Sequence, residues 1–136
     1  MKLTTQDAER AVLKADSQYH KQFQTYETVN LGHVVVLNQR CGVDGCFWFR
    51  IWLVYKKQSN IIAREIYDSD SQDNLHCFYV FLHKAAIENG VLQITLNGQL
   101  GWSVWSDVQK REVHTNKVVL QIPDIMGGKI KWIAVD

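Results

Sequence analysis

Apolar residues recur every three or four positions over residues 5–30, which is the spacing of one face of an α-helix. The stripe begins with small alanines such as Ala8 and ends with aromatic residues such as Tyr26. Thr4 followed three residues later by Asp7 resembles a capping box, and neither glycine nor proline interrupts the run. The pattern therefore predicts one long N-terminal helix.

From residue 33 onward the pattern changes to the alternation and β-branched composition of strands. A glycine-rich turn sequence at residues 42–45 predicts a hairpin between the two strands beside it. Asn97-Gly98 is the strongest local hairpin signal in the C-terminal third. The expected strands are residues 34–41, 46–55, 61–67, 91–96, 100–108, 117–122 and 129–135.

Residues 75–89 fit two interpretations. As a helix they have one apolar face, a capping Asp73 at the start and Gly90 at the end. As a strand, residues 77–82 have high β-propensity. The caps at both ends favour the helix, so a second helix at residues 74–89 is predicted.

These elements predict a single α+β domain over residues 1–136, a length that fits one compact core. A long N-terminal helix followed by antiparallel strands resembles the element order of cystatin-like and NTF2-like domains. The resemblance implies a helix lying across a curved, mostly antiparallel sheet. Such folds host both enzymes and binding proteins, so the resemblance assigns no activity.

The expected strand at residues 46–55 is apolar on both faces. A sheet with one solvated face alternates apolar and polar residues, so both faces of this strand must be covered. The long helix can cover one of them. Trp48 and Trp52 flank Arg50 on the second face, at a spacing that allows a cation–π contact. That face packs beneath the C-terminal strands, meets another subunit, or binds a planar or anionic ligand.

Trp102 and Trp105 lie three residues apart in another expected strand, so they point to opposite faces unless a bulge intervenes. One indole is then expected in the core and the other nearer the surface. Trp105 is therefore a further candidate for binding.

Charge and apolar run length exclude several classes of protein. The 15 basic and 14 acidic residues are spread evenly along the chain, whereas nucleic-acid binders normally cluster their basic residues. The longest apolar run, residues 77–82, is far shorter than the about 20 residues that span a bilayer. The N-terminus turns polar at once, so a cytoplasmic protein without a membrane segment is expected.

The three cysteines are Cys41, Cys46 and Cys77, and an odd number argues against a disulfide framework. With His76 they could form a zinc site, but the four residues between Cys41 and Cys46 depart from the usual spacing. Free thiols are preferred, and no metal and no cofactor is predicted.

No nucleophile elbow, phosphate-binding loop, dinucleotide fingerprint or zinc-protease motif occurs, so no catalytic residue is assigned. Surplus aromatic surface without such motifs predicts a small non-catalytic binding or interaction protein. It would associate with itself, as a dimer or larger homo-oligomer, or with a protein partner through an aromatic sheet face. The candidate residues are Trp48, Arg50, Trp52 and Trp105.

Two alternatives stay open. The first is a small pocket enzyme, a hydrolase or isomerase, in which His76 or His83 meets Asp68 or Glu65 for acid–base chemistry. The second is a carrier that holds a small apolar ligand in the same pocket.

Overall fold

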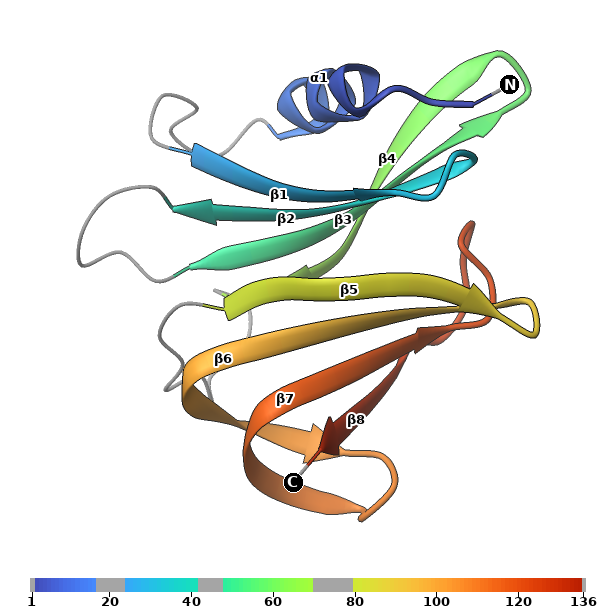
Figure 1. Ribbon diagram of the computed structural model, residues 1–136. Coiled ribbons are helices and arrows are strands. Elements are labelled where there is room, and N and C mark those ends of the chain that lie inside the picture. The colour runs from blue at the N-terminus through green and yellow to red at the C-terminus, as the bar shows by residue number, and fades with distance from the viewer. Residues whose placement is uncertain (1, 17–23, 42–47, 70–79, 136) are drawn as a thin grey trace. The chain divides into compact units, whose positions relative to one another are not determined.

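One helix and eight strands make up the computed structural model, which describes residues 2–16, 24–41, 48–69 and 80–135 (Figure 1). The chain divides into two compact units, Met1–Asp70 and Ser71–Asp136, each with its own four-stranded antiparallel sheet. The α+β class with antiparallel sheets is confirmed, and the expectation of a single domain stays a prediction. The elements are α1 (Thr5–Ala15), β1 (Gln24–Asn30), β2 (Val34–Cys41), β3 (Phe49–Lys57), β4 (Asn60–Asp68), β5 (Val80–Glu88), β6 (Val91–Ser106), β7 (Arg111–Ile122) and β8 (Lys131–Val135).

The prediction of a helix over residues 5–30 is wrong at Asp16 and over residues 24–30, while residues 17–23 lie outside the described residues. The helix begins as expected, with the Thr4 side chain accepting a hydrogen bond from the backbone N–H of Asp7. It ends at Asp16, whose backbone is extended, and residues 24–30 form β1. This later segment holds two threonines and a valine, and β-branched side chains favour strands over helices.

In the first unit the strand order is β1-β2-β3-β4, and each neighbouring pair is antiparallel. The predicted hairpin of β2 and β3 and the predicted strand β4 are confirmed, while the turn at residues 42–45 lies outside the described residues. Every residue from Phe49 to Tyr55 is buried, which confirms that both faces of this strand are covered.

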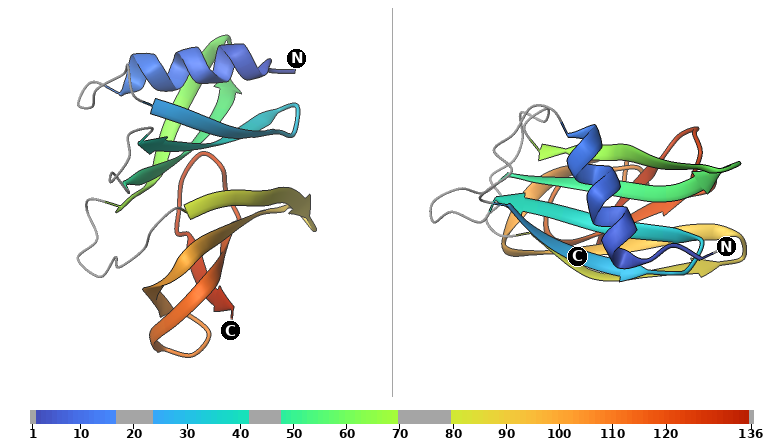
Figure 2. Two further views of the ribbon diagram at one scale, coloured as in Figure 1. Left: turned by 60° about the vertical axis from the view of Figure 1, so that its left-hand side comes forward. Right: turned by 90° about the horizontal axis from the view of Figure 1, so that it is seen from above.

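The helix α1 lies across the first sheet, as Figure 2 shows in the view from above. Its buried residues Ala8 and Val12 pack against the side chains of Leu37, Trp52 and Val54. The helix therefore covers the even-numbered face of β3, the same face that carries Arg50. The expectation that Arg50 and Trp52 lie on the face away from the helix is wrong, because Trp52 packs against α1. An isolated helix of 11 residues is marginal in water, so this packing is what holds α1 in place.

In the second unit the order is β5-β6-β7-β8, again antiparallel throughout. The predicted helix at 74–89 is wrong over Val80–Glu88, which is β5, and residues 74–79 lie outside the described residues. Asn89 and Gly90 have φ values of 53° and 78°, the left-handed pair that a two-residue hairpin turn needs. Gly90 therefore turns a hairpin and does not end a helix.

The predicted turn at Asn97-Gly98 is also wrong, because both residues belong to the long strand β6. The register with β7 shifts between Asn97 and Trp102, and Gly101 there has a φ of 83°. Trp102 is fully buried and Trp105 is 58% exposed, which confirms that the two indoles differ in burial. In the described part of the chain, no helix is long and apolar enough to cross a membrane.

Candidate functional site

A buried ion-pair cluster lies where α1 ends on the first sheet. Arg50 donates from Nη1 to Oδ1 of Asp16 at 2.8 Å and from Nη2 to the carboxylate of Glu65, and its Nε lies 3.9 Å from Oδ2 of Asp68. The side chains of Arg50 and Asp16 are only 6% and 0% exposed. Asp16 caps the C-terminal end of α1, where a cation is favourable, so Arg50 ties the helix end to β3.

Gln39 and Trp52 continue the cluster. The indole Nε1 of Trp52 donates to Oε1 of Gln39 at 2.8 Å, and Nε2 of Gln39 donates to Oδ2 of Asp16 at 2.8 Å. An indole N–H can only donate, so the orientation of the Gln39 amide is determined and both oxygens of Asp16 are used. The guanidinium carbon of Arg50 lies 4.7 Å from the centroid of the Trp52 ring, which is the predicted cation–π contact.

A β-bulge brings the two acidic residues of β4 to the same face. Arg50 opposes Asp68 and Trp52 opposes Glu65, and the register shifts between Ile51 and Trp52. Side chains alternate along a strand, so residues three apart would normally point to opposite faces. One extra residue on β4 therefore places both carboxylates beside Arg50.

The pKa values of Arg50 and of the nearby Tyr26 both depart from their ordinary values. The pKa of Arg50 is raised above its ordinary value, because the hydrogen bonds and charges of Glu65 and Asp16 outweigh burial, which acts against the cation. The pKa of Tyr26, which opposes Gln39 on β1, is raised by burial and then by the negative charge of Asp16. Both shifts favour the protonation states that the cluster holds at neutral pH.

The structure brings two of the four candidate residues together. Arg50 and Trp52 are in contact and buried beneath α1, while Trp48 lies partly buried just before β3. Trp105 belongs to β6 in the second unit. That these residues bind a ligand or partner stays a prediction.

Sequence reasoning missed Asp16 as a partner of Arg50, the link that Gln39 makes between Asp16 and Trp52, and the joint role of Glu65 and Asp68. One signal was present. An arginine between tryptophans on a strand covered on both faces must be buried, and a buried charge requires opposite charges beside it.

A shallow groove of about 640 Å³ runs between α1 and the edge strand β4. Its floor is apolar, and Ile61 there is 38% exposed. Arg10 and Lys14 stand on its helix side, with Asp7 at 3.7 Å from Arg10 in an exposed ion pair. The lining residues are Asp7, Arg10, Ala11, Lys14, Ala15, Ile61, Ile62 and Ala63.

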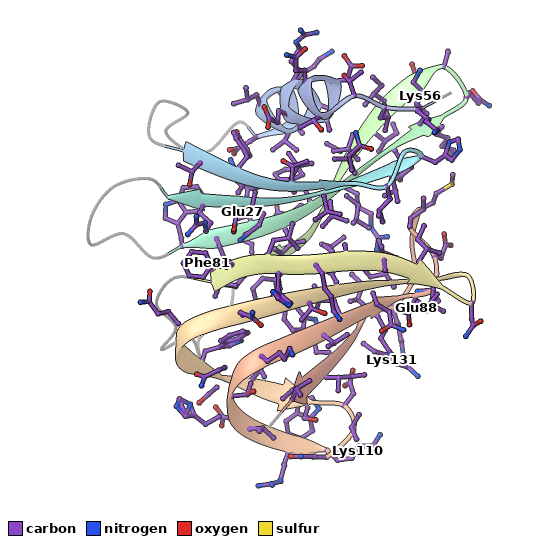
Figure 3. The ribbon with its side chains drawn as sticks, viewed as in Figure 1. Glu27, Lys56, Phe81, Glu88, Lys110 and Lys131 are labelled. Atoms are coloured by element: carbon purple, nitrogen blue, oxygen red, sulfur yellow. The ribbon has the colours of Figure 1, made fainter. Side chains whose placement is uncertain are left out.

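A second cavity, of about 500 Å³, lies within the second unit between the turn after β6 and the strand β8. Lys110 and Lys131, both labelled in Figure 3, line it together with Lys129. Its remaining walls are Asp107, Val108, Gln121, Ile130 and Ile133.

The residues of the open alternatives are only partly described. His33, His83 and His114 are exposed, whereas His20 and His76 lie outside the described residues. Cys46 and Cys77 also lie outside them, so the choice between thiols and a zinc site stays a prediction. Among residues 2–16, 24–41, 48–69 and 80–135, no group of three or more His, Cys, Asp or Glu is placed to hold a metal ion.

Comparisons with protein families, with curated proteins and with solved structures find no match to this chain. The resemblance in element order to cystatin-like and NTF2-like domains therefore stays a prediction. The pocket enzyme and the apolar carrier stay predictions too.

Proposed function

We propose that this protein is a non-catalytic binding protein that holds an extended segment of a partner protein along β4, with apolar side chains of that segment in the α1–β4 groove. Strand β4 ends the order β1-β2-β3-β4, and the described residues pair it with β3 alone. An edge strand presents unpaired backbone N–H and C=O groups to a further strand, the mode of recognition known as strand addition.

The observation that carries the proposal is the exposed Ile61 beside the apolar floor of the groove. Natural sheets protect their edges with charges, and β4 has these only in its later half, at Arg64, Glu65 and Asp68. The half that begins at Ile61 has none through Ala63, so this end of the edge is open to an apolar partner.

Charge on the groove indicates the chemistry of that partner. Arg10 and Lys14 contribute two positive charges against the single negative charge of Asp7. Lys14 is exposed, and no described carboxylate lies within ion-pair distance of it. An acidic residue next to the apolar anchors of the segment would complement this side of the groove.

The test is a selection of peptides from a random library displayed on phage, with the purified protein as bait. We expect the enriched peptides to share apolar residues at alternating positions and an acidic residue, and to bind Ile61→Lys at least tenfold more weakly than wild type. Ile87→Lys is the matched control, because Ile87 is also an exposed isoleucine on an edge strand, β5.

Peptides that bind wild type and Ile61→Lys equally would overturn the proposal. Light scattering during gel filtration measures the oligomeric state, and it tests whether a second copy of this chain occupies β4 in place of a partner segment. A dimer that Ile61→Lys dissociates would show that a second copy of this chain occupies β4, and it would replace the partner segment proposed here.

A further inference from the structure

Hydrogen bonds within the second unit join the two sides of the lysine-lined cavity, namely the turn after β6 and the strand β8. The backbone N–H of Asp107 donates to the carbonyl oxygen of Trp132 at 3.0 Å, and Oδ2 of Asp107 accepts from the backbone N–H of Trp132 at 2.9 Å. The N–H of Lys110 donates to the carbonyl oxygen of Ser106 at 2.8 Å. The turn between β6 and β7 is thereby fastened to β8, which fixes the mouth of the cavity.

Strand register places polar and apolar groups side by side on the cavity floor. Gln121 of β7 and Lys131 of β8 are direct cross-strand partners, so their side chains share one face of the sheet. Ile133 lies two residues after Lys131 and points to the same face. The volume of about 500 Å³ lies within the range of small-molecule sites, about 300–1,000 Å³.

The charge of the lining is strongly one-sided. Lys110, Lys129 and Lys131 contribute three positive charges, and Asp107 is the single acidic residue of the lining. One oxygen of that carboxylate already accepts the N–H of Trp132. None of the three ammonium groups lies within ion-pair distance of a carboxylate among the described residues. The lining therefore carries a net charge of about +2, and none of its three ammonium groups is paired with a described carboxylate.

We propose that this cavity binds a small organic phosphate monoester. Such an ester is close to a dianion at neutral pH, because its second pKa is about 6, and it matches the excess positive charge. The ammonium groups of Lys110, Lys129 and Lys131 hold the phosphate oxygens, and the organic part packs against Ile130 and Ile133. This site is separate in sequence and in its residues from the β4 groove, so it does not depend on the proposed partner segment.

A substitution at Lys110 distinguishes a role in ligand binding from a role in stability. Its φ is 58°, in the left-handed region where a side chain is costly and glycine is not. Lys110→Gly should therefore unfold at the same urea concentration as wild type or at a higher one. The same variant should bind the phosphate ester more weakly, because it loses one of three cations.

The experiment is a titration of the ¹⁵N-labelled full chain with phenyl phosphate at low ionic strength. Binding is monitored through the amide chemical shifts. Inorganic phosphate supplies the charge without the ring, and phenol supplies the ring without the charge. We expect saturable shifts at Lys110, Gln121 and Lys129–Ile133, and tighter binding of phenyl phosphate than of either fragment. The double variant Lys129→Gln/Lys131→Gln should bind phenyl phosphate about tenfold more weakly than wild type, or more weakly still.

Lys84→Gln is the control, since it removes an equal charge from β5 outside the cavity and should leave the affinity unchanged. The proposal is overturned if the lysine double variant binds phenyl phosphate as wild type does. Shifts that spread over the surface without saturation would overturn it equally. A negative result of this titration would not bear on the proposed binding of a partner segment at β4.

Discussion

Arg50→Met is the substitution that most directly tests the buried cluster. It preserves most of the side-chain volume and removes the cation that Asp16, Glu65 and Asp68 surround. Asp16 is fully buried, so its negative charge would lose the cation that Arg50 places 2.8 Å away. Breaking a buried pair by removing one partner costs about 3–5 kcal/mol.

Most of that loss should come from Asp16. Glu65 and Asp68 are 32% and 20% exposed, so water screens their interactions with Arg50 and each contributes less than about 1 kcal/mol. We expect the free energy of unfolding to fall by about 3–5 kcal/mol at pH 7, a large share of the about 5–15 kcal/mol of a typical domain.

Urea unfolding followed by tryptophan fluorescence and by circular dichroism measures this loss, at pH 7 and again at about pH 4.5. In Arg50→Met the buried carboxylate of Asp16 can take up a proton as the pH falls, which removes the buried charge. The loss should therefore shrink at the lower pH. A loss of packing alone would not depend on pH in this way.

Arg10→Met is the matched control, because Arg10 forms an exposed ion pair with Asp7 and should cost less than about 0.5 kcal/mol. Combining Arg50→Met with Asp16→Asn should cost less than the sum of the two single changes, by about 1–3 kcal/mol. A loss below about 1 kcal/mol for Arg50→Met that is equal at both pH values would refute the reasoning.

Three further predictions concern single positions. Gly101→Ala should cost about 1–2 kcal/mol in thermal unfolding, because φ is 83° and a Cβ would lie 2.8 Å from the side-chain Oδ1 of Asn116. Gly127→Ala meets nothing within 4 Å and should cost little. Because the pKa of Tyr26 is raised, the stability it confers is complete below about pH 10 and is lost above it. Urea midpoints at about pH 8 and 10.5 should thus fall further for wild type than for Tyr26→Phe. Trp105→Ala should change stability by less than about 0.5 kcal/mol, and Trp102→Ala by about 3–5 kcal/mol, both measured in urea.

The central strands could be predicted because their burial is visible in local sequence. Residues 49–55 are apolar on both faces except for Arg50, and such a run between turn signals is typical of a strand covered on both faces. The helix was overextended for a related reason. Tyr26 sits at a helical spacing from the apolar stripe of α1, and it equally suits a position on β1, where it opposes Gln39. Periodicity over one or two turns does not separate these alternatives.

The sequence misplaces β5 and one hairpin turn of the second sheet because the chain contains two Asn-Gly pairs. The pair at Asn89 and Gly90 was assigned to a helix cap, which left Asn97 and Gly98 as the natural hairpin turn. In the structure the earlier pair forms the hairpin turn, and the later pair lies at the irregular part of β6. The pairing of β6 with β5 and β7 decides between two equally good local turn signals. Local sequence does not reveal this pairing.

The buried cluster required information that lies far apart in the sequence. Asp16, Gln39, Arg50 and Glu65 come from four elements, and the bulge opposite Ile51 determines which acidic residues face Arg50. A register error of one residue would turn each of them to the other face. The sequence therefore predicts Arg50 and Trp52 among four candidate binding residues, without the partners that surround them.

The cluster also bears on the groove, since both depend on the position of α1. Lys14 and Ala15, which line the groove, immediately precede Asp16, the residue that Arg50 and Gln39 hold. If the cluster loses its cation, the last turn of a helix too short to be stable alone loses one of the two side chains that hold Asp16 to the sheet. Arg50→Met should then weaken peptide binding at β4 although Arg50 does not line the groove. An Arg50→Met variant that remains folded and binds the selected peptides as tightly as wild type would show that the groove does not need this anchor.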